Sequence, residues 1–489
     1  MLEVIVLALL GAATLLYLYI NHIYGYWNKK GLTQPPTKIG FGNVYAAFTM
    51  KTNLGIVIDE IYRSYPEHDA VGIYSCLTPK LLVRSPELIK TVTVTEFSSF
   101  HDNEFSVNKE LDPYFAMDPF VIRGEEWKPQ RAKLVTRLTP ARMKEIFPLM
   151  KDIIPRLRTY IDDNIDKDFE AKDLATLFSM DIVSDTVFGI SSNCFSDQEA
   201  PFRKFGDIMM KEQLQTWWKT LIIQFFPHLK KLFGFALLPP VVCKYLEEVV
   251  QEVIAYRKNN GISRNDLFQF VLKKESGDFK EVMHFATTFF IEGFETASMV
   301  ASSTIYELAM NPDVQEKLYD EVKSMYNENE DIDYETVTNS PYLDNIIQES
   351  QRKYPVLYYM DRLCTKPCHL DIDGKSVEIE TGTPVILPMF AIHRDPLYYP
   401  NPEVFDPERF NAENKAARPA YTYIPFGEGP RICPGMKYGL NQVKLFVSSI
   451  VQKYKILKSE KTPEKITFSP NSFLVTPNER LWIRLEKRK

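Results

Sequence analysis

The sequence lacks the features that mark several large classes of protein. Its 489 residues include only six cysteines, too few for the disulfide framework of a small secreted chain. Basic residues are not in excess, because 58 Lys and Arg stand against 64 Asp and Glu, and this balance argues against a nucleic-acid-binding protein. No Gly/Ser-rich linker, repeat or low-complexity tract divides the chain after residue 50. We therefore expect one large domain there.

Charge is also missing from one stretch near the N-terminus. Residues 4–27 carry no charged side chain, and Val4–Ile20 is almost continuously apolar. About 20 such residues cross a bilayer as a helix. Glu3 precedes this stretch and Lys29 and Lys30 follow it, so the positive charge on its C-terminal side predicts a cytoplasmic body behind a membrane anchor.

A cleaved signal peptide is the alternative interpretation of this stretch. Such a peptide begins with basic residues and ends at small ones, whereas the order of charges is reversed here and bulky tyrosines lie where cleavage would fall. We therefore favour an uncleaved anchor, and expect a chain made of an anchor at residues 1–28, a proline-containing linker at 29–45 and one domain at 46–489.

Apolar residues are abundant in that domain, and their spacing is mostly helical. The whole chain is 45% hydrophobic and 13% aromatic, which is enough for a large core. The pattern predicts a mainly α fold with small β-sheets. Helices are expected near 126–137, 141–165, 170–187, 242–259, 281–309, 313–326, 341–354 and 436–454; strands are expected at 71–75, 80–84 and within 361–392, and a Pro-rich coil at 394–425.

The strongest chemical signal is the string Phe-Gly-Glu-Gly-Pro-Arg-Ile-Cys-Pro-Gly at residues 426–435. Its glycines permit a tight loop that brings the backbone against a flat ligand. Cys433 comes just before the helix expected at 436–454, and the positive end of that helix favours thiolate over thiol. A thiolate is a strong, soft metal ligand, and Arg431 could pair with a carboxylate of the same cofactor.

A second candidate metal site is weaker. Cys364 and Cys368 lie four residues apart, with His369 beside them. No second cysteine pair exists to complete a zinc site, so we favour two ordinary thiols in a strand-rich stretch.

The string at 426–435 resembles the cysteine loop of the cytochromes P450, Phe-x-x-Gly-x-Arg-x-Cys-x-Gly. Each fixed position matches, namely Phe426, Gly429, Arg431, Cys433 and Gly435. The resemblance extends over essentially the whole chain. It implies a single haem domain that holds haem b (iron-protoporphyrin IX) through the Cys433 thiolate. It also implies a monooxygenase that inserts one atom of O2 into a small lipophilic substrate, by hydroxylation or epoxidation.

Glu349 and Arg352 are similar to the family's Glu-x-x-Arg pair, and their spacing puts both side chains on one face of a helix. Phe405–Phe410 resembles the partner segment in the family. The resemblance therefore implies that Arg409 joins Glu349 and Arg352 in a buried charged triad that supports the haem pocket.

Three residues are implied as partners of the haem propionates. Trp127 and Arg131 match the family's Trp-x-x-x-Arg, and Arg362 lies where related enzymes place another propionate partner. For Arg362, a surface arginine is the alternative.

A Gly-x-acid-Thr core lies inside the apolar helix expected at 281–309. In the family such a core is the oxygen groove, where Gly293 opens room over the iron and Thr296 and Glu295 deliver protons. The alternative is that Thr296 only hydrogen-bonds its own helix.

Glu292 departs from the family pattern, because alanine or glycine usually precedes Gly293. The fatty-acid ω-hydroxylase branch has glutamate at this position, where it forms an ester with a haem methyl, so a covalent link from Glu292 to the haem is a hypothesis. The wording of the other motifs is more similar to the insect branch that metabolises xenobiotics and hormones. Glu292 and Ala297 are the residues that favour the alternative of a haem-binding carrier, sensor or degenerate homologue, whereas Thr296 and the intact cysteine loop oppose it.

The sequence has neither the length for a fused reductase nor a Gly-x-Gly-x-x-Gly after a strand. The resemblance therefore implies that electrons come from a separate NADPH-dependent cytochrome P450 reductase, with cytochrome b5 as a second donor, at the endoplasmic reticulum membrane. Candidate docking residues for the reductase are Lys128, Lys133, Lys437 and Lys444. The alternative is that they are ordinary solvated lysines on helix surfaces.

The expected substrate-pocket segments are mostly apolar, so we expect a fatty acid, steroid, terpenoid or foreign compound as substrate. These segments are 101–119, 205–235, 285–296, 356–362 and Phe473. Residues 215–240 are unusually apolar, and core burial and a second membrane contact both explain them.

Overall fold

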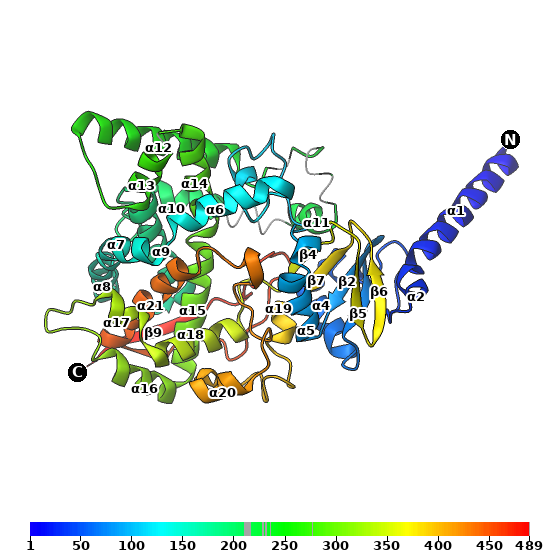
Figure 1. Cartoon of the computed structure of the whole chain (residues 1–489). Coiled ribbons are helices and arrows are strands. Elements are labelled where there is room, and N and C mark those ends of the chain that lie inside the picture. The colour runs from blue at the N-terminus through cyan, green and yellow to red at the C-terminus, as the bar shows by residue number, and fades with distance from the viewer. Residues whose placement is uncertain (210–216, 227–228, 230–231, 235, 276, 489) are drawn as a thin grey trace.

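A computed structural model describes residues 1–209, 217–226, 229, 232–234, 236–275 and 277–488. A large helical region lies beside a smaller region that holds most of the strands, and helix α1 (Leu2–Tyr24) projects from the strand-containing side (Figure 1). The predicted mainly α fold with small sheets is confirmed.

The helical region contains most of the helices. They are α6 (Trp127–Arg137), α7 (Pro140–Lys151), α8 (Ile154–Asp163), α9 (Ala171–Val183), α10 (Pro201–Asp207), α12 (Pro240–Asn260), α13 (Leu267–Lys274), α14 (Phe279–Glu292), α15 (Glu295–Met310), α16 (Pro312–Val322), α17 (Tyr334–Thr338), α18 (Pro341–Lys353) and α21 (Met436–Lys453). Helix α11 (Trp217–Phe225) lies beside the strand-containing region (Figure 1).

Shorter helices lie mainly around the sheets: α2 (Tyr26–Lys29), α3 (Tyr45–Phe48), α4 (Leu54–Ser64), α5 (Pro86–Lys90), α19 (Met389–Ile392) and α20 (Ala412–Ala417).

The strands form three small sheets. The largest has the order β1 (Ala70–Ser75), β2 (Thr78–Val83), β7 (Pro384–Leu387), β4 (Met360–Leu363), with β2 and β7 parallel and the other pairs antiparallel. The second has the order β3 (Phe169–Glu170), β9 (Trp482–Lys487), β8 (Tyr454–Lys458), and β5 (Cys368–Ile372) pairs with β6 (Lys375–Ile379). The predicted strands at 71–75 and 80–84 form the β1–β2 hairpin.

Helix ends follow from local sequence. Asp278 begins α14 by accepting a hydrogen bond from the backbone N–H of Lys280. Pro341 lies in the first turn of α18, where a missing N–H costs nothing. Pro355 follows Tyr354, the residue at which α18 ends, because proline disfavours helical geometry in the residue before it.

Two helices predicted as continuous are interrupted. The segment 141–165 is divided into α7 and α8, with Pro155 in the first turn of α8. The segment 281–309 is divided into α14 and α15 at Gly293 and Phe294. The prediction of unbroken helices was wrong because apolar spacing continues on both sides of each interruption.

Helix α15 lies at the centre of the helical core. It packs against both α9 and α21, and nearly all of its side chains are buried. Helix α21 is likewise buried from Asn441 to Val451. Helix α15 carries part of the predicted oxygen groove, and helix α21 follows the predicted ligand Cys433. These two helices therefore lie in direct contact.

The N-terminal helix is exposed over most of its length but is fixed at its C-terminal end. By its length and composition, α1 is long and apolar enough to cross a membrane. Trp27, just beyond it, is fully buried, and its Nε1 donates to the Ile73 carbonyl of β1 at 3.2 Å. A Cβ atom at Gly72 would lie 2.2 Å from the Trp27 ring, so this packing requires glycine.

The apolar segment 215–240 contains both buried and exposed side chains. Phe225 is buried and its ring lies 5.5 Å from that of Phe48, whereas Leu232 and Phe233 are 78% and 57% exposed. Residues 215–216, 227–228, 230–231 and 235 of this segment lie outside the described residues.

Candidate functional site

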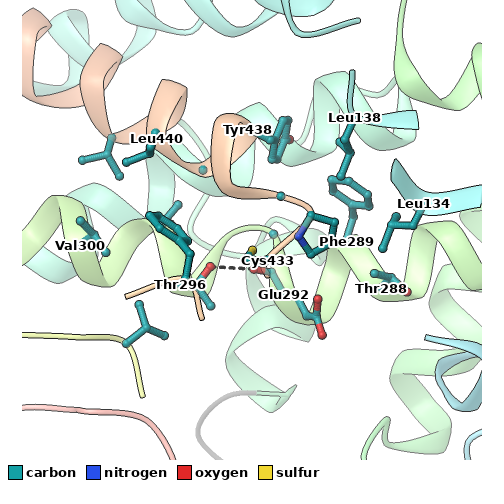
Figure 2. Close-up of a pocket in the computed structure, with 18 of the residues that line it drawn as sticks. Leu134, Leu138, Thr288, Phe289, Glu292, Thr296, Val300, Cys433, Tyr438 and Leu440 are labelled. Carbon is teal, nitrogen blue, oxygen red and sulfur yellow. Dashed lines mark hydrogen bonds between the residues drawn. The ribbon is translucent and has the colours of Figure 1, made fainter. Parts of the chain in front are cut away.

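A cavity lies between the α14–α15 junction and the first turns of α21 (Figure 2). Most of its lining is apolar. The residues that line it are Leu134, Leu138, Thr288, Phe289, Glu292, Gly293, Thr296, Ala297, Val300, Gln351, Val356, Phe426, Cys433, Pro434, Gly435, Tyr438, Gly439, Leu440 and Val443.

Cys433 reaches this cavity from a loop that the backbone fixes tightly. Its N–H donates to the Phe426 carbonyl at 2.8 Å. Gly427 and Gly429 have φ of 77° and 72°, the left-handed region that favours glycine. A Cβ at Gly429 would lie 2.0 Å from the Thr93 carbonyl oxygen, so glycine here permits close contact with a neighbouring backbone.

Several groups act on the thiol of Cys433, whose side chain is accessible from the cavity. Its surroundings raise its pKa to about 11, first through burial and second through the carboxyl of Glu292. The N–H of Gly435, at the start of α21, and the charge of Arg131 act in the opposite direction. A metal cation bound to the sulfur would lower this pKa.

The α14–α15 junction faces the sulfur across the cavity. Thr296 donates through Oγ1 to the Glu292 carbonyl at 2.8 Å, as the dashed line in Figure 2 shows. A Cβ at Gly293 would lie 2.5 Å from the Phe289 carbonyl oxygen, so only glycine fits this backbone. Thr296 thus both lines the cavity and bonds its own helix.

The two glutamates of the junction point in different directions. The Glu292 side chain extends into the cavity, and burial raises its pKa well above the usual range. Glu295 instead pairs with Lys172 of α9 at 2.8 Å, and Lys172 also donates to Ser298. The structure brings Thr296 and Glu292 together at the cavity, and does not bring Thr296 and Glu295 together there.

Guanidinium groups gather beside the cysteine loop. Arg431 donates to the carbonyls of Pro119 and Ile122, and its guanidinium lies 4.6 Å from the Trp127 ring centroid. Arg131 donates to the Ile432 carbonyl. This concentration of positive charge favours an anionic group next to the cavity.

Arg362 completes this cluster from β4. It is 2% exposed and donates to Asn103 Oδ1 at 2.7 Å, so the alternative of a surface arginine is wrong. Burial lowers the pKa of Arg362 to about 10. Within the described residues, neither Arg362 Nε nor Trp127 Nε1 has a hydrogen-bond partner. Buried donors of this kind normally have an acceptor.

The predicted charged triad is present. Arg352 donates to Glu349 through Nε at 2.7 Å, with both side chains fully buried, and Arg409 approaches Glu349 at 3.5 Å. Arg352 also donates to the Pro402 carbonyl. These contacts fix α18 to the coil that precedes the cysteine loop.

The predicted lysine docking face is only partly exposed. Lys444 is buried and pairs with Asp344 at 2.8 Å, so its inclusion was wrong. Lys133 pairs with Glu281 at 2.6 Å. Lys128 and Lys437 are exposed.

The other expectations from sequence have mixed outcomes. In the part of the chain that the structure describes, no group of three His, Cys, Asp or Glu side chains could hold a metal ion, so Cys364, Cys368 and His369 form no such site. Of the expected pocket segments, 285–296 and 356–362 reach the cavity. Phe473 packs against Phe105 of the expected segment 101–119, with ring centroids 5.8 Å apart and the ring planes tilted by 31°.

Sequence reasoning missed two buried hydrogen bonds near the cavity. Thr288 donates to Asp118 at 2.8 Å, and Gln442 of α21 donates to the Gly293 carbonyl at 3.2 Å. The four-residue spacing of Thr288, Glu292 and Thr296 is a signal that places Thr288 on the cavity face. No local pattern marks Asp118 or Gln442.

Known proteins were compared with the whole chain. The family model for cytochrome P450 matches residues 34–484. Cytochrome P450 6k1 of Blattella germanica is 33% identical over 95% of this chain and 94% of its own length, and probable cytochrome P450 6a13 of Drosophila melanogaster is 33% identical over 96% of each. Cytochrome P450 6l1 of Blattella germanica is 34% identical over 93% of this chain and 91% of its own length. Matches of this extent show that the chain belongs to the cytochrome P450 family of monooxygenases, whose haem has a cysteine thiolate as axial ligand.

Proposed function

We propose that this chain is a membrane-anchored monooxygenase that holds haem b through Cys433 and hydroxylates or epoxidises a small lipophilic substrate. The observation that carries the proposal is the cavity itself, in which the sulfur of Cys433 faces the Gly293–Thr296 junction across a mostly apolar space. An apolar lining supports a lipophilic substrate because burying apolar surface supplies most of its binding free energy.

The residues around the cavity fit a haem. Cys433 would supply the axial sulfur, and Arg131, Arg362 and Arg431 would balance the two propionate charges. The unpartnered Nε1 of Trp127 and Nε of Arg362 are donors that propionate oxygens would satisfy. When bound, the haem supplies the O2 activation that no side chain provides.

The chain's own residues would manage protons and water in the groove. The hydroxyl of Thr296 is held by the Glu292 carbonyl, so its Oγ1 faces the cavity as an acceptor that can orient a water molecule. Glu295 would relay protons from outside the cavity, where Lys172 and Ser298 hold it. Gly293 leaves the space in which O2 would bind.

Glu292 carries a second hypothesis, a covalent ester with a haem methyl group. Its carboxyl extends into the cavity and pairs with no residue in the described part of the chain. Forming that ester would exchange a methyl C–H and the carboxyl O–H for one C–O bond, and the enzyme's own reaction with O2 would accept the two electrons and two protons released. Mass spectrometry of acid-denatured holoprotein tests it, because haem released at its free mass excludes the bond.

The proposed cellular site is the endoplasmic reticulum membrane, with the catalytic domain in the cytoplasm. Residues 1–28 would anchor the chain, 29–45 would link the anchor, and 46–489 would form the domain. A separate NADPH-dependent cytochrome P450 reductase, with cytochrome b5 as a second donor, would supply electrons. The exposed Lys128 and Lys437 remain candidate docking residues.

The test uses full-length protein in detergent or lipid, with Cys433→Ser as the variant and Cys368→Ser as the matched control. We expect the wild type and the control to give the thiolate-type spectrum of the reduced carbonyl complex, and the Cys433 variant to lose it. Wild-type protein that binds no haem, or a Cys433 variant with an unchanged spectrum, would overturn the proposal. A wild type that binds haem but oxidises no member of a lipophile panel with reductase and NADPH would favour the haem carrier or sensor instead.

A further inference from the structure

The junction between α14 and α15 leaves backbone carbonyls without their usual helical partners. In a continuous helix the carbonyls of Glu292 and Gly293 would accept from the backbone N–H groups four residues later. Here side chains replace those donors. Thr296 donates through Oγ1 to the Glu292 carbonyl at 2.8 Å, and Gln442 donates through Nε2 to the Gly293 carbonyl at 3.2 Å.

Gln442 reaches this junction from α21, the helix that follows Cys433. Its side chain is 1% exposed, so water does not compete for its amide. Ser179 of α9 donates to Gln442 Oε1 at 2.5 Å, and Ser179 is also buried. One amide therefore connects three central helices at the point where the groove opens.

The orientation of that amide follows from its neighbours. The Gly293 carbonyl can only accept, so the NH2 group of Gln442 has to face it, and Oε1 then faces the Ser179 hydroxyl. A methionine at this position would fill a similar space but could not donate to Gly293. Comparison with Ser179→Ala, which removes only the bond to Ser179, separates the two hydrogen bonds.

We propose that Gln442 is a positioning residue that holds the oxygen groove open by bonding the Gly293 carbonyl. The inference rests on the proposed function, because it assigns this contact a role in directing O2 chemistry at the same cavity. Without the bond, the Gly293 carbonyl is free to turn back toward the N–H of Ala297, which would close the junction into a continuous helix. Thr296 would then lose its fixed bond to Glu292, and proton delivery would become less selective.

The experiment compares Gln442→Met and Gln442→Leu with wild-type holoprotein. Ser179→Ala separates the second bond, because it keeps the donation to Gly293. Thr186→Val is the matched control, since Thr186 also bonds α21 from a buried position, through the Tyr438 hydroxyl at 2.7 Å, without reaching the junction. Each variant is first checked for the thiolate-type reduced carbonyl spectrum, which reports on Cys433 and not on the groove.

Two readouts follow. The infrared band of carbon monoxide bound to the reduced protein reports the groove geometry directly, and we expect it to shift in both Gln442 variants and to stay unchanged in Thr186→Val. The hydrogen peroxide released per substrate molecule oxidised should rise about fivefold in the Gln442 variants, the ratio that corresponds to the loss of one buried hydrogen bond.

The outcomes separate the two proposals. An unchanged infrared band and peroxide ratio in Gln442→Met would overturn the positioning role while the proposed function stands. Equal changes in Thr186→Val would also overturn it, because they would indicate general loosening of α21. Wild-type protein without a thiolate-type spectrum would instead overturn the proposed function.

Discussion

The two sides of the cavity are built in different ways. The cysteine side has a largely local backbone, because the Cys433 N–H and two left-handed glycines shape residues 426–435, and distant contacts such as those of Arg431 with the Pro119 and Ile122 carbonyls come in addition. The opposite side depends on residues far apart in sequence, since the α14–α15 junction is held by Gln442 of α21 and its Glu295 by Lys172 of α9. A local structure tolerates change elsewhere in the chain, whereas a structure assembled from distant residues depends on the packing of the whole helical core.

The largest expected effect tests how far the cysteine side depends on contacts outside its own loop. Arg352→Leu would leave the fully buried Glu349 without its main partner, and we expect a loss of about 3–5 kcal/mol in the free energy of unfolding, with loss of bound haem. Thermal and denaturant unfolding measure it. Arg409→Leu is the control, because it leaves the closer Arg352 contact intact and should cost about 1 kcal/mol. Equal losses in the two variants would contradict the dominance of the Glu349–Arg352 pair.

The second prediction concerns the loop glycines. Gly429→Ala places a Cβ against the Thr93 carbonyl in a left-handed backbone, and we expect it to cost at least about 2 kcal/mol and to reduce haem content. Gly25→Ala is the control, because Gly25 lies outside the loop with φ of −84° and its Cβ would meet the His22 carbonyl oxygen at 3.4 Å, an ordinary contact, so this variant should fold with its haem. Haem content per protein after purification measures both. Normal loading of Gly429→Ala would show that the loop can move away from Thr93.

The third prediction tests the opposite side. Thr296→Val removes the hydroxyl at the junction, and we expect product formation to fall about tenfold to a hundredfold while the reduced carbonyl spectrum is kept. Thr304→Val is the matched control, because Thr304 makes the same kind of bond, to the Val300 carbonyl, on the same helix but further along it. If both variants lose activity equally, the effect belongs to helix stability and not to the groove.

The smallest expected effect distinguishes the two glutamates. Glu295→Gln weakens the pair between the buried Glu295 and the partly exposed Lys172, so we expect a stability change under about 1 kcal/mol. We also expect a slower proton-dependent step, seen as a changed solvent isotope effect. Lys172→Met should reproduce that isotope effect if the pair acts together. Glu292→Gln should instead change the affinity for lipophiles, measured by spectral titration, because its side chain extends into the cavity. Identical behaviour of the two glutamine variants would contradict the different directions of these side chains.

The same contrast explains how much the sequence could predict. The cysteine loop and the Glu349–Arg352–Arg409 triad were predicted because their short strings resemble motifs of the cytochrome P450 family. The break at Gly293 was not, because the carbonyls it frees are satisfied by Thr296 and by Gln442, and the second lies on another helix.

Burial of charged side chains was the other limit. Lys444 follows the pattern of an exposed helix residue, and only its pairing with Asp344 and the Val337 carbonyl shows that it is buried. The resemblance to the family implied that Glu295 and Thr296 deliver protons together in the groove. Adjacent residues of a helix point about 100° apart, so the neighbour of a cavity residue often faces another element.

The fully buried Trp27, packed against Gly72, means that α1 does not continue into a free tether. A bilayer that held α1 would therefore also limit the tilt of the catalytic domain, because α1 is rigidly packed against it. A lipophile dissolved in that bilayer would then meet one side of the domain repeatedly instead of all sides at random.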